Sequence, residues 1–156
     1  MTGSRTPGDE VSARGFRVAI VAARFNDFIV ASLLQGASAV WAERGGAPAD
    51  LTVLRVPGAF ELPLLARRLG ASGRYDAVVA LGCVIRGDTP HFDYVAGECA
   101  RGLLQAGLDT GVPVIFGVLT VETVEQALER AATHAGNKGG EAMEAALEMA
   151  ALLKQL

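Results

Sequence analysis

Four short apolar segments alternate with longer segments of helical periodicity along this chain of 156 residues. Each apolar segment is continuous rather than alternately polar and apolar, which is typical of parallel strands buried on both faces. These segments are residues 16–23, 51–56, 76–83 and 113–118. The helical segments are residues 28–44, 60–72, 91–107, 122–135 and 140–154. The alternation predicts an α/β fold, a three-layer αβα sandwich with a four-stranded parallel sheet at its centre.

Glycine, proline and capping residues mark the ends of these segments. Gly45 and Gly46 end the first helical segment. Thr89 and Pro90 predict an N-cap followed by proline at the first helical position. Residues 136–140, Gly-Asn-Lys-Gly-Gly, predict a break between the last two helices. Because residues 1–14 are polar and contain glycine and proline, we expect a flexible N-terminal arm over 1–14 and a single domain over 15–156.

Composition restricts the partners of such a domain. The chain has 14 Lys and Arg against 17 Asp and Glu, a net charge of −3, which disfavours a nucleic-acid partner. The apolar segments are shorter than the roughly 18 residues of a membrane-spanning helix, and no secretory signal is recognisable, so we expect a cytoplasmic protein with no membrane partner. A hydrophobic fraction of 51% with only 20% charged residues is high for such a protein and predicts a homo-oligomer with extensive interfaces.

Common cofactor and metal signatures are absent from the sequence. It contains no G-x-G-x-x-G, no phosphate-binding G-x-x-x-x-G-K-[ST] and no G-x-S-x-G. Cys83, His91 and Cys99 are evenly spaced, but His91 and Cys99 would lie about 12 Å apart along one helix. Zinc ligands lie only about 2.0–2.3 Å from the metal, so we expect no metal site.

Parallel sheets bind ligands beyond the C-terminal ends of their strands, and several candidate phosphate ligands follow the strands here. The turn from Gly87 to Thr89 opens the third helix, where free N–H groups and the helix dipole favour an anion. An ordinary helix cap explains Thr89 equally well. Arg130 and Lys138 are the candidate phosphate-binding cations, although Arg130 also fits a solvated helix face.

The same sheet edge has a candidate acid–base and several aromatic side chains. His91 suits proton transfer near neutral pH, and it is equally consistent with a plain surface histidine. Phe25, Phe60 and Phe116 can stack on a planar ligand or belong to the core, and for Phe116 the pattern favours the core. Glu61 can accept hydrogen bonds from ligand hydroxyls or favour the dipole of its helix.

Five stretches together resemble the 6,7-dimethyl-8-ribityllumazine synthase family. They are residues 24–29 (RFNDFI), 56–63 (VPGAFELP), 80–95 (ALGCVIRGDTPHFDYV), 113–120 (PVIFGVLT) and 136–139 (GNKG). They occur in the family's order from about residue 16 to the C-terminus. One such stretch can arise by chance, but five in register are specific.

The resemblance implies a transferase of riboflavin biosynthesis that acts in its penultimate step. The family condenses 5-amino-6-(D-ribitylamino)uracil with L-3,4-dihydroxy-2-butanone 4-phosphate to 6,7-dimethyl-8-ribityllumazine, releasing phosphate and water, without a metal or organic cofactor. By this resemblance His91 is the proton-transfer residue, and Phe116 reaches the site of a neighbouring subunit. The pyrimidine- and ribityl-binding residues are Phe25, Ala59, Phe60, Glu61, Cys83, Val84, Ile85 and Phe116. The phosphate-binding residues are Asp88, Thr89, Arg130 and Lys138.

The resemblance also concerns assembly, because family members are pentamers or shells of twelve pentamers. Residues 133–140 form a short stretch without the insertion of the pentamer-only members, so we expect a sixty-subunit shell. Two other functions remain open for the same flavodoxin-like architecture. One is a flavin-binding carrier, which would bind FMN, and the other is a non-catalytic shell protein. The intact set of Phe25, Glu61, His91 and Arg130 argues against the shell protein.

Overall fold

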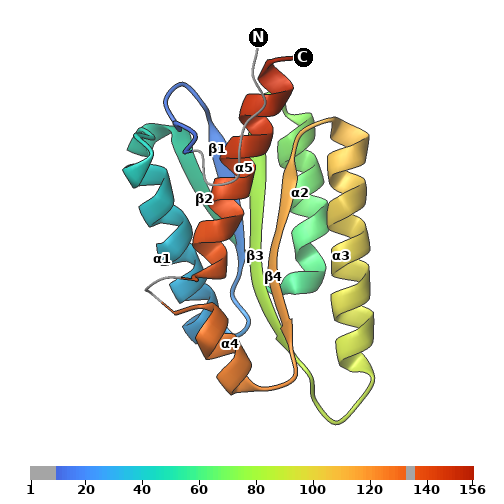
Figure 1. Cartoon of the computed structure of the whole chain (residues 1–156). Coiled ribbons are helices and arrows are strands. Elements are labelled where there is room, and N and C mark those ends of the chain that lie inside the picture. Colours follow the sequence, from blue (N-terminus) through green and yellow to red (C-terminus); the bar gives the residue numbers. More distant parts are fainter. Residues whose placement is uncertain (1–9, 133–135) are drawn as a thin grey trace.

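A four-stranded parallel sheet with the order β2-β1-β3-β4 forms the centre of the molecule (Figure 1). The structure, a computed structural model, describes residues 10–132 and 136–156. Its strands are β1 (Val18–Ala23), β2 (Leu51–Val56), β3 (Ala77–Ile85) and β4 (Val114–Val121). The central strands β1 and β3 are buried almost throughout, whereas the edge strands β2 and β4 are partly exposed. This confirms the predicted parallel sheet.

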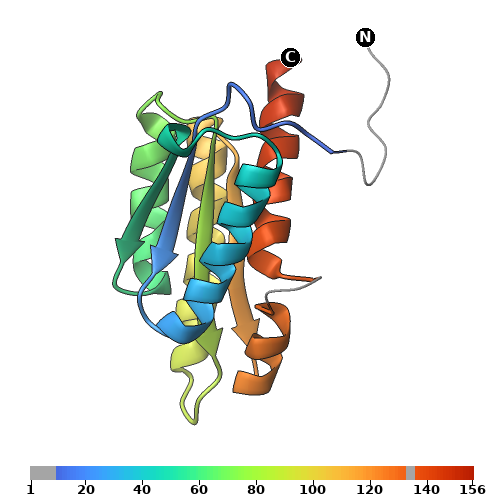
Figure 2. The same cartoon turned by 90° about the vertical axis from the view of Figure 1, so that its left-hand side faces the viewer.

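Helices cover both faces of the sheet, which confirms the three-layer αβα architecture (Figures 1 and 2). On one face lie α1, α4 and α5, and on the other lie α2 and α3. The bounds are α1 Asp27–Glu43, α2 Leu62–Ala71, α3 His91–Thr110, α4 Val124–Arg130 and α5 Lys138–Lys154. Two 3₁₀ turns, η1 (Pro48–Asp50) and η2 (Ala59–Glu61), precede β2 and α2.

The two halves of the core share the residues of β1 alternately, because successive side chains of a strand point to opposite faces. Val18, Ile20 and Ala22 pack in the cluster with α1 and α5. Ala19, Val21 and Ala23 pack in the cluster with α2 and α3. Burial on both faces therefore explains why this strand is continuously apolar in sequence.

Helices α1 and α5 approach each other closely through glycine and one buried asparagine. A Cβ atom on Gly139 would collide with the backbone carbonyl of Leu33 in α1. Asn137 caps α5, because its Oδ1 accepts from Gly140 N at 3.0 Å. Its Nδ2 donates to the carbonyl oxygens of Ser32 (3.1 Å) and Ala131 (3.2 Å). This one side chain thus holds the start of α5 against α1 and against the residue that follows α4.

Several element boundaries differ from those that the sequence predicts. The helix predicted over 122–135 is shorter, since α4 begins after Thr123, whose Oγ1 accepts from Gln126 N at 3.1 Å, and ends at Arg130. Residues 133–135 of that prediction lie outside the described residues. The last helix begins at Lys138 rather than at 140, because Asn137 is its cap. Lys138 is therefore helical and not part of a loop.

The strands that lead to the candidate site are longer than expected. The segment predicted over 76–83 continues to Ile85, and the one predicted over 113–118 continues to Val121, because the two strands pair through Ile85 and Val121. The third helix, predicted over 91–107, continues to Thr110, where Gly111 ends it in the left-handed region. Pro90 occupies the N-cap position of this helix, one residue later than expected.

Part of the predicted arm packs on the domain. Residues 1–9 lie outside the described residues. In the following stretch Val11 and Ala13 are buried, and Ala13 N donates to the carbonyl oxygen of Arg44 at 2.9 Å. Residues 10–14 are thereby tied to the end of α1.

Candidate active site

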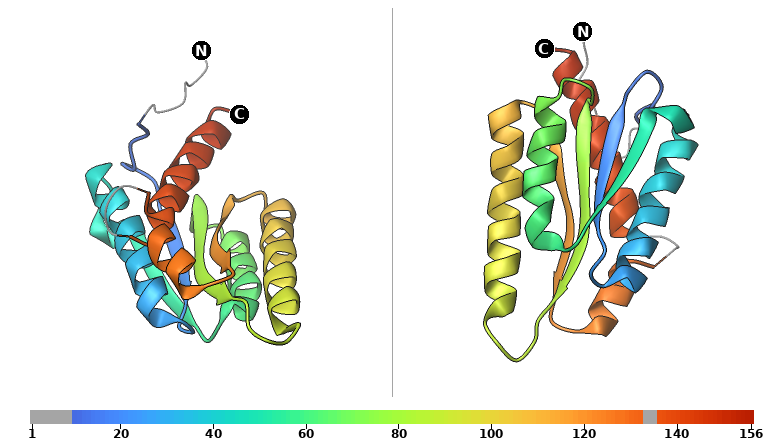
Figure 3. Two further views of the ribbon diagram at one scale, coloured as in Figure 1. Left: turned by 60° about the horizontal axis from the view of Figure 1, so that its bottom comes forward. Right: turned by 180° about the vertical axis from the view of Figure 1, so that it is seen from behind.

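A cleft lies beyond the C-terminal ends of β1, β2 and β3, at the end of the molecule that Figure 3 (left) turns toward the viewer. It consists of two adjoining cavities of about 540 Å³ and about 250 Å³. Phe25, Ala59, His91 and Val95 line both cavities. We call this region the strand-end cleft. Its position is the one where open parallel sheets bind their ligands.

The turn after β1 holds Phe25 over this cleft. Arg24 N and Phe25 N donate to the carbonyl oxygens of Val56 (2.7 Å), the last residue of β2, and of Pro57 (3.0 Å), the next residue. The next residue, Asn26, has φ 61°, a left-handed conformation that asparagine tolerates better than most residues. The Phe25 ring remains 70% exposed. The backbone is therefore fixed while the ring stays available for stacking.

Asn26 itself is a site residue that sequence reasoning missed. Its Nδ2 donates to the carbonyl oxygen of Cys83 near the end of β3, at 2.9 Å. It also lines the smaller cavity. An asparagine between a strand and a helix was the available signal, because asparagine is enriched at single left-handed positions.

The second wall of the cleft comes from the turn after β2. Pro57 and Gly58 lead into η2, and Glu61 N donates to the carbonyl oxygen of Gly58 at 3.2 Å. This turn aligns Ala59, Phe60 and Glu61 along the larger cavity. Phe60 is more than half exposed, so this wall adds a second aromatic ring to that of Phe25.

The third wall is the last part of β3, where Cys83, Val84 and Ile85 line the smaller cavity. β1 pairs with β3 only as far as Leu81, whereas β4 pairs with it through Ile85. The backbone of β3 therefore extends past β1, and in this stretch the Cys83 carbonyl oxygen accepts its hydrogen bond from Asn26 instead. The side chains of Cys83 and Val84 are buried, so little of either side chain is exposed to the cleft.

The buried thiols Cys83 and Cys99 are poor nucleophiles. Burial raises the pKa of each thiol to about 11. Only about a thousandth of a thiol with that pKa is ionised at pH 8, compared with about a quarter of a thiol with the usual pKa near 8.5. Since the thiolate is the reactive form, neither cysteine suits nucleophilic catalysis.

Iodoacetamide at pH 8 is accordingly expected to leave both cysteines of the folded protein unmodified for hours. In urea at the same pH both are expected to react within minutes, at the rate of free glutathione. Mass spectrometry of the intact chain counts the added groups. Rapid labelling of the folded protein at pH 8 would contradict the raised pKa values.

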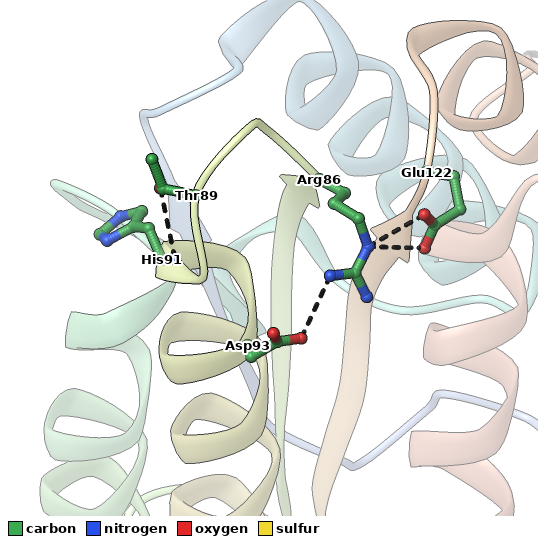
Figure 4. Close-up of polar contacts among 5 residues, drawn as sticks. All are labelled: Arg86, Thr89, His91, Asp93 and Glu122. Atoms are coloured by element: carbon green, nitrogen blue, oxygen red, sulfur yellow. Dashed lines mark hydrogen bonds and ion pairs between the residues drawn. The ribbon is translucent and has the colours of Figure 1, made fainter.

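The loop from β3 to α3 closes the cleft and presents His91. His91 is exposed in the first turn of α3, and its backbone N donates to Thr89 Oγ1 at 3.4 Å (Figure 4). Gly87 and Thr89 line the smaller cavity beside it, whereas Asp88, the other predicted phosphate ligand of this loop, does not line either cavity. The start of α3 therefore combines an exposed imidazole with the backbone N–H groups that favour an anion.

Phe116, Arg130 and Lys138 form a second group away from this cleft. All three line a separate pocket of about 410 Å³ along β4, bounded by α4 and α5, which we call the β4 pocket. Arg130 Nη1 donates to the carbonyl oxygen of Gln126 at 3.0 Å, and Lys138 Nζ lies 3.1 Å from Glu141 Oε1. Both cations thus face the same pocket as a partly exposed aromatic ring.

The expectation that Phe116 lies at the same edge of the sheet as Phe25, Phe60 and His91 is wrong. Phe116 is the third residue of β4 and pairs with Ala80, five residues before Ile85. At about 3.3 Å per residue, it lies roughly 16 Å upstream of the strand end. Within one chain the β4 pocket and the strand-end cleft share no lining residue.

No metal centre is recognisable in residues 10–132 and 136–156, where no three His, Cys, Asp or Glu side chains come together. In the same part of the chain no helix has the length and apolar character needed to cross a membrane.

Comparison with known proteins finds similarity along nearly the whole chain. Residues 15–154 match a family model described as 6,7-dimethyl-8-ribityllumazine synthase. A curated protein of that name from Nitratidesulfovibrio vulgaris (strain DSM 19637 / Miyazaki F) is 53% identical to this chain over 152 residues. That alignment covers 97% of each protein.

Proposed function

The chain belongs to the 6,7-dimethyl-8-ribityllumazine synthase family, and from this premise we propose that the strand-end cleft is its active site. The enzyme is a transferase of riboflavin biosynthesis. It condenses 5-amino-6-(D-ribitylamino)uracil with L-3,4-dihydroxy-2-butanone 4-phosphate to 6,7-dimethyl-8-ribityllumazine, releasing phosphate and water. The observation that carries the assignment of the site is the lining of the cleft, which includes every expected pyrimidine- and ribityl-binding residue except Phe116.

The aminouracil lies in the cleft with its ring against Phe25. This ring is exposed above a fixed turn, so stacking costs little conformational entropy. The end of β3 at Cys83–Ile85 extends beyond its pairing with β1 and faces the polar edge of the pyrimidine, with the Cys83 carbonyl oxygen held by Asn26. The Glu61 carboxylate borders the larger cavity and accepts hydrogen bonds from the ribityl hydroxyls.

His91 moves the protons. Imine formation, phosphate elimination and ring closure each require a proton to be transferred, and one imidazole can serve several of these steps in turn. The phosphate of the second substrate lies at the start of α3, near Gly87 and Thr89, where backbone N–H groups favour an anion. Holding the two substrates together supplies a large part of the acceleration.

Each active site is completed by a second copy of the chain, which contributes Phe116, Arg130 and Lys138. The separation of the β4 pocket from the strand-end cleft supports this arrangement, because within one chain neither cation lines the cleft. Exposed apolar side chains on α2, α3, β4 and α4, some of them in these two regions, support contact between copies. They are Leu64, Tyr94, Leu104, Leu108, Phe116, Val124 and Leu128. This surface accounts for the high hydrophobic fraction of the sequence.

The homo-oligomer is a sixty-subunit shell of twelve pentamers in the cytoplasm. The short stretch 133–140, of which residues 133–135 lie outside the described part, supports the shell over a free pentamer. Two free cysteines buried in separate halves of the core support a reducing compartment. Light scattering after size exclusion is expected to give a particle of about sixty chains. A particle of pentamer mass alone would contradict the shell.

Mixing both substrates with the purified protein tests the function. We expect the absorbance and fluorescence of the lumazine product to appear only when both substrates are present. Because the reaction uses no metal, EDTA is expected to leave the rate unchanged. Absence of product, together with tight binding of FMN, would favour the flavin carrier instead.

A further inference from the structure

Arg86 joins three elements at the start of the loop that leads to His91 (Figure 4). It follows the last residue of β3, and its N–H donates to the carbonyl oxygen of Val121 at the end of β4 at 2.9 Å. Its Nε donates to both carboxylate oxygens of Glu122, at 2.9 and 3.1 Å. Its Nη1 donates to Asp93 Oδ1 in the first turn of α3 at 3.3 Å, and its guanidinium carbon lies 4.3 Å from the centre of the Phe92 ring. The side chain thus ties β4 to α3.

These contacts close the loop that contains the proposed phosphate ligands. The loop leaves the sheet after Arg86 and ends at His91, where α3 begins, and residues 87–91 are all exposed. A Cβ atom on Gly87 would meet nothing within 4 Å, so the loop is open on that side. The ion pair between Arg86 and Asp93 connects the start of the loop with the helix turn that presents His91. Arg86, Asp93 and Glu122 form what we call the Arg86 cluster. In Figure 4 the His91 ring and this cluster lie on different sides of that turn.

The charges in the Arg86 cluster favour a role in orienting the loop over a role in attracting phosphate. Hydrogen bonding to Glu122, with Asp93 nearby, raises the pKa of Arg86 above its usual range, so its positive charge is permanent. Two carboxylates surround this single cation. The cluster as a whole is therefore negative and offers no net attraction to a phosphate.

We propose that Arg86, held by Glu122 and Asp93, is a positioning residue that sets the phosphate-binding loop and His91 relative to the strand-end cleft. The inference rests on the proposed function of that cleft. Arg86 acts through the loop and does not touch the substrate. Exposed ion pairs contribute little to global stability, so the role of this cluster lies in local geometry rather than in folding.

The variant Glu122→Gln separates positioning from electrostatic attraction. Removal of a negative charge near the loop strengthens phosphate binding if attraction dominates. If Glu122 orients Arg86, the same change weakens binding. We expect Glu122→Gln and Arg86→Gln each to raise the KM for the butanone phosphate and the inhibition constant of inorganic phosphate about tenfold or more, as a displaced binding group does.

Two further variants sharpen the result. Arg86→Lys retains the charge but not the planar fork, so it is expected to rescue less than half of the loss in kcat/KM. The double variant Arg86→Gln with Glu122→Gln is expected to have the same KM for the butanone phosphate as the more impaired of the two single variants, because the two residues act as one unit. Full rescue by lysine, or additive losses, would contradict a shared positioning role.

Arg101→Gln is the matched control. Arg101 lies on α3, the helix that also contains Asp93, and its Nε lies 3.6 Å from Glu98 Oε2. This ion pair is far along α3 from the loop. We expect Arg101→Gln to leave both constants within about twofold of the wild type, and all variants to keep the wild-type melting temperature within a few degrees. If the wild type is active and Glu122→Gln binds inorganic phosphate as tightly as the wild type or more tightly, the inference about Arg86 is wrong and the proposed function still stands. A wild type that forms no lumazine would overturn the proposed function, and the inference with it.

Discussion

Gly139→Ala is expected to lower the free energy of unfolding by about 3 kcal/mol or more. The added Cβ atom would overlap the backbone carbonyl of Leu33 in α1. A backbone group of a helix, unlike the end of a flexible side chain, does not move aside easily. The collision separates α5 from α1, and with them the contacts of Asn137 that hold the start of α5. A loss of this size is a large fraction of the roughly 5–15 kcal/mol that stabilises a typical domain. It should lower the melting temperature by roughly 6–12 °C.

Gly97→Ala is the matched control for this prediction. Gly97 is also helical, but a Cβ atom there would meet nothing within 4 Å. Because alanine favours a helix over glycine, this variant is expected to be as stable as the wild type or more stable by up to about 1 kcal/mol. Urea unfolding followed through the buried Trp41, at one protein concentration because assembly adds stability, measures both changes. A Gly139→Ala variant with wild-type stability would show that α1 and α5 do not pack this closely.

His91→Ala is expected to lower kcat by about a hundredfold without abolishing turnover. His91 lines both cavities of the strand-end cleft and is exposed to the substrates, so its imidazole can exchange protons with each reacting group in turn. The remaining rate comes from holding the two substrates together. Steady-state measurement of lumazine formation, with both substrates varied, separates kcat from KM. Loss of all turnover would contradict a mechanism in which positioning contributes most.

Arg130→Ala provides the contrast, because it removes a cation and leaves the proton-transfer residue in place. We expect a KM for the butanone phosphate at least tenfold higher with little change in kcat, as for the loss of a charged hydrogen bond of about 1.5–3 kcal/mol. An unchanged KM would remove Arg130 from the phosphate site. The opposite patterns of the two variants would assign separate roles to the strand-end cleft and the β4 pocket.

Local sequence patterns predicted the elements of the fold but not all of their ends. Continuous apolar segments predicted the strands well, because burial on both faces selects Val, Ile and Leu regardless of the surroundings. The last helix began earlier than predicted because Asn137, read as part of a break, is its cap. The ends of β3 and β4 depend on their mutual pairing through Ile85 and Val121, which neither segment encodes alone.

By itself, the sequence determined the parallel α/β architecture, the family and the residue types available for chemistry. These properties follow from burial periodicity and from short motifs, which are local along the chain. Tertiary structure alone decided that Phe116 lies upstream in β4, in a pocket with Arg130 and Lys138 and apart from the strand-end cleft. It also decided that Arg86 lies between Asp93 and Glu122, which come from different elements. Both outcomes depend on strand register and helix packing, and these are set by contacts between segments that are distant in sequence.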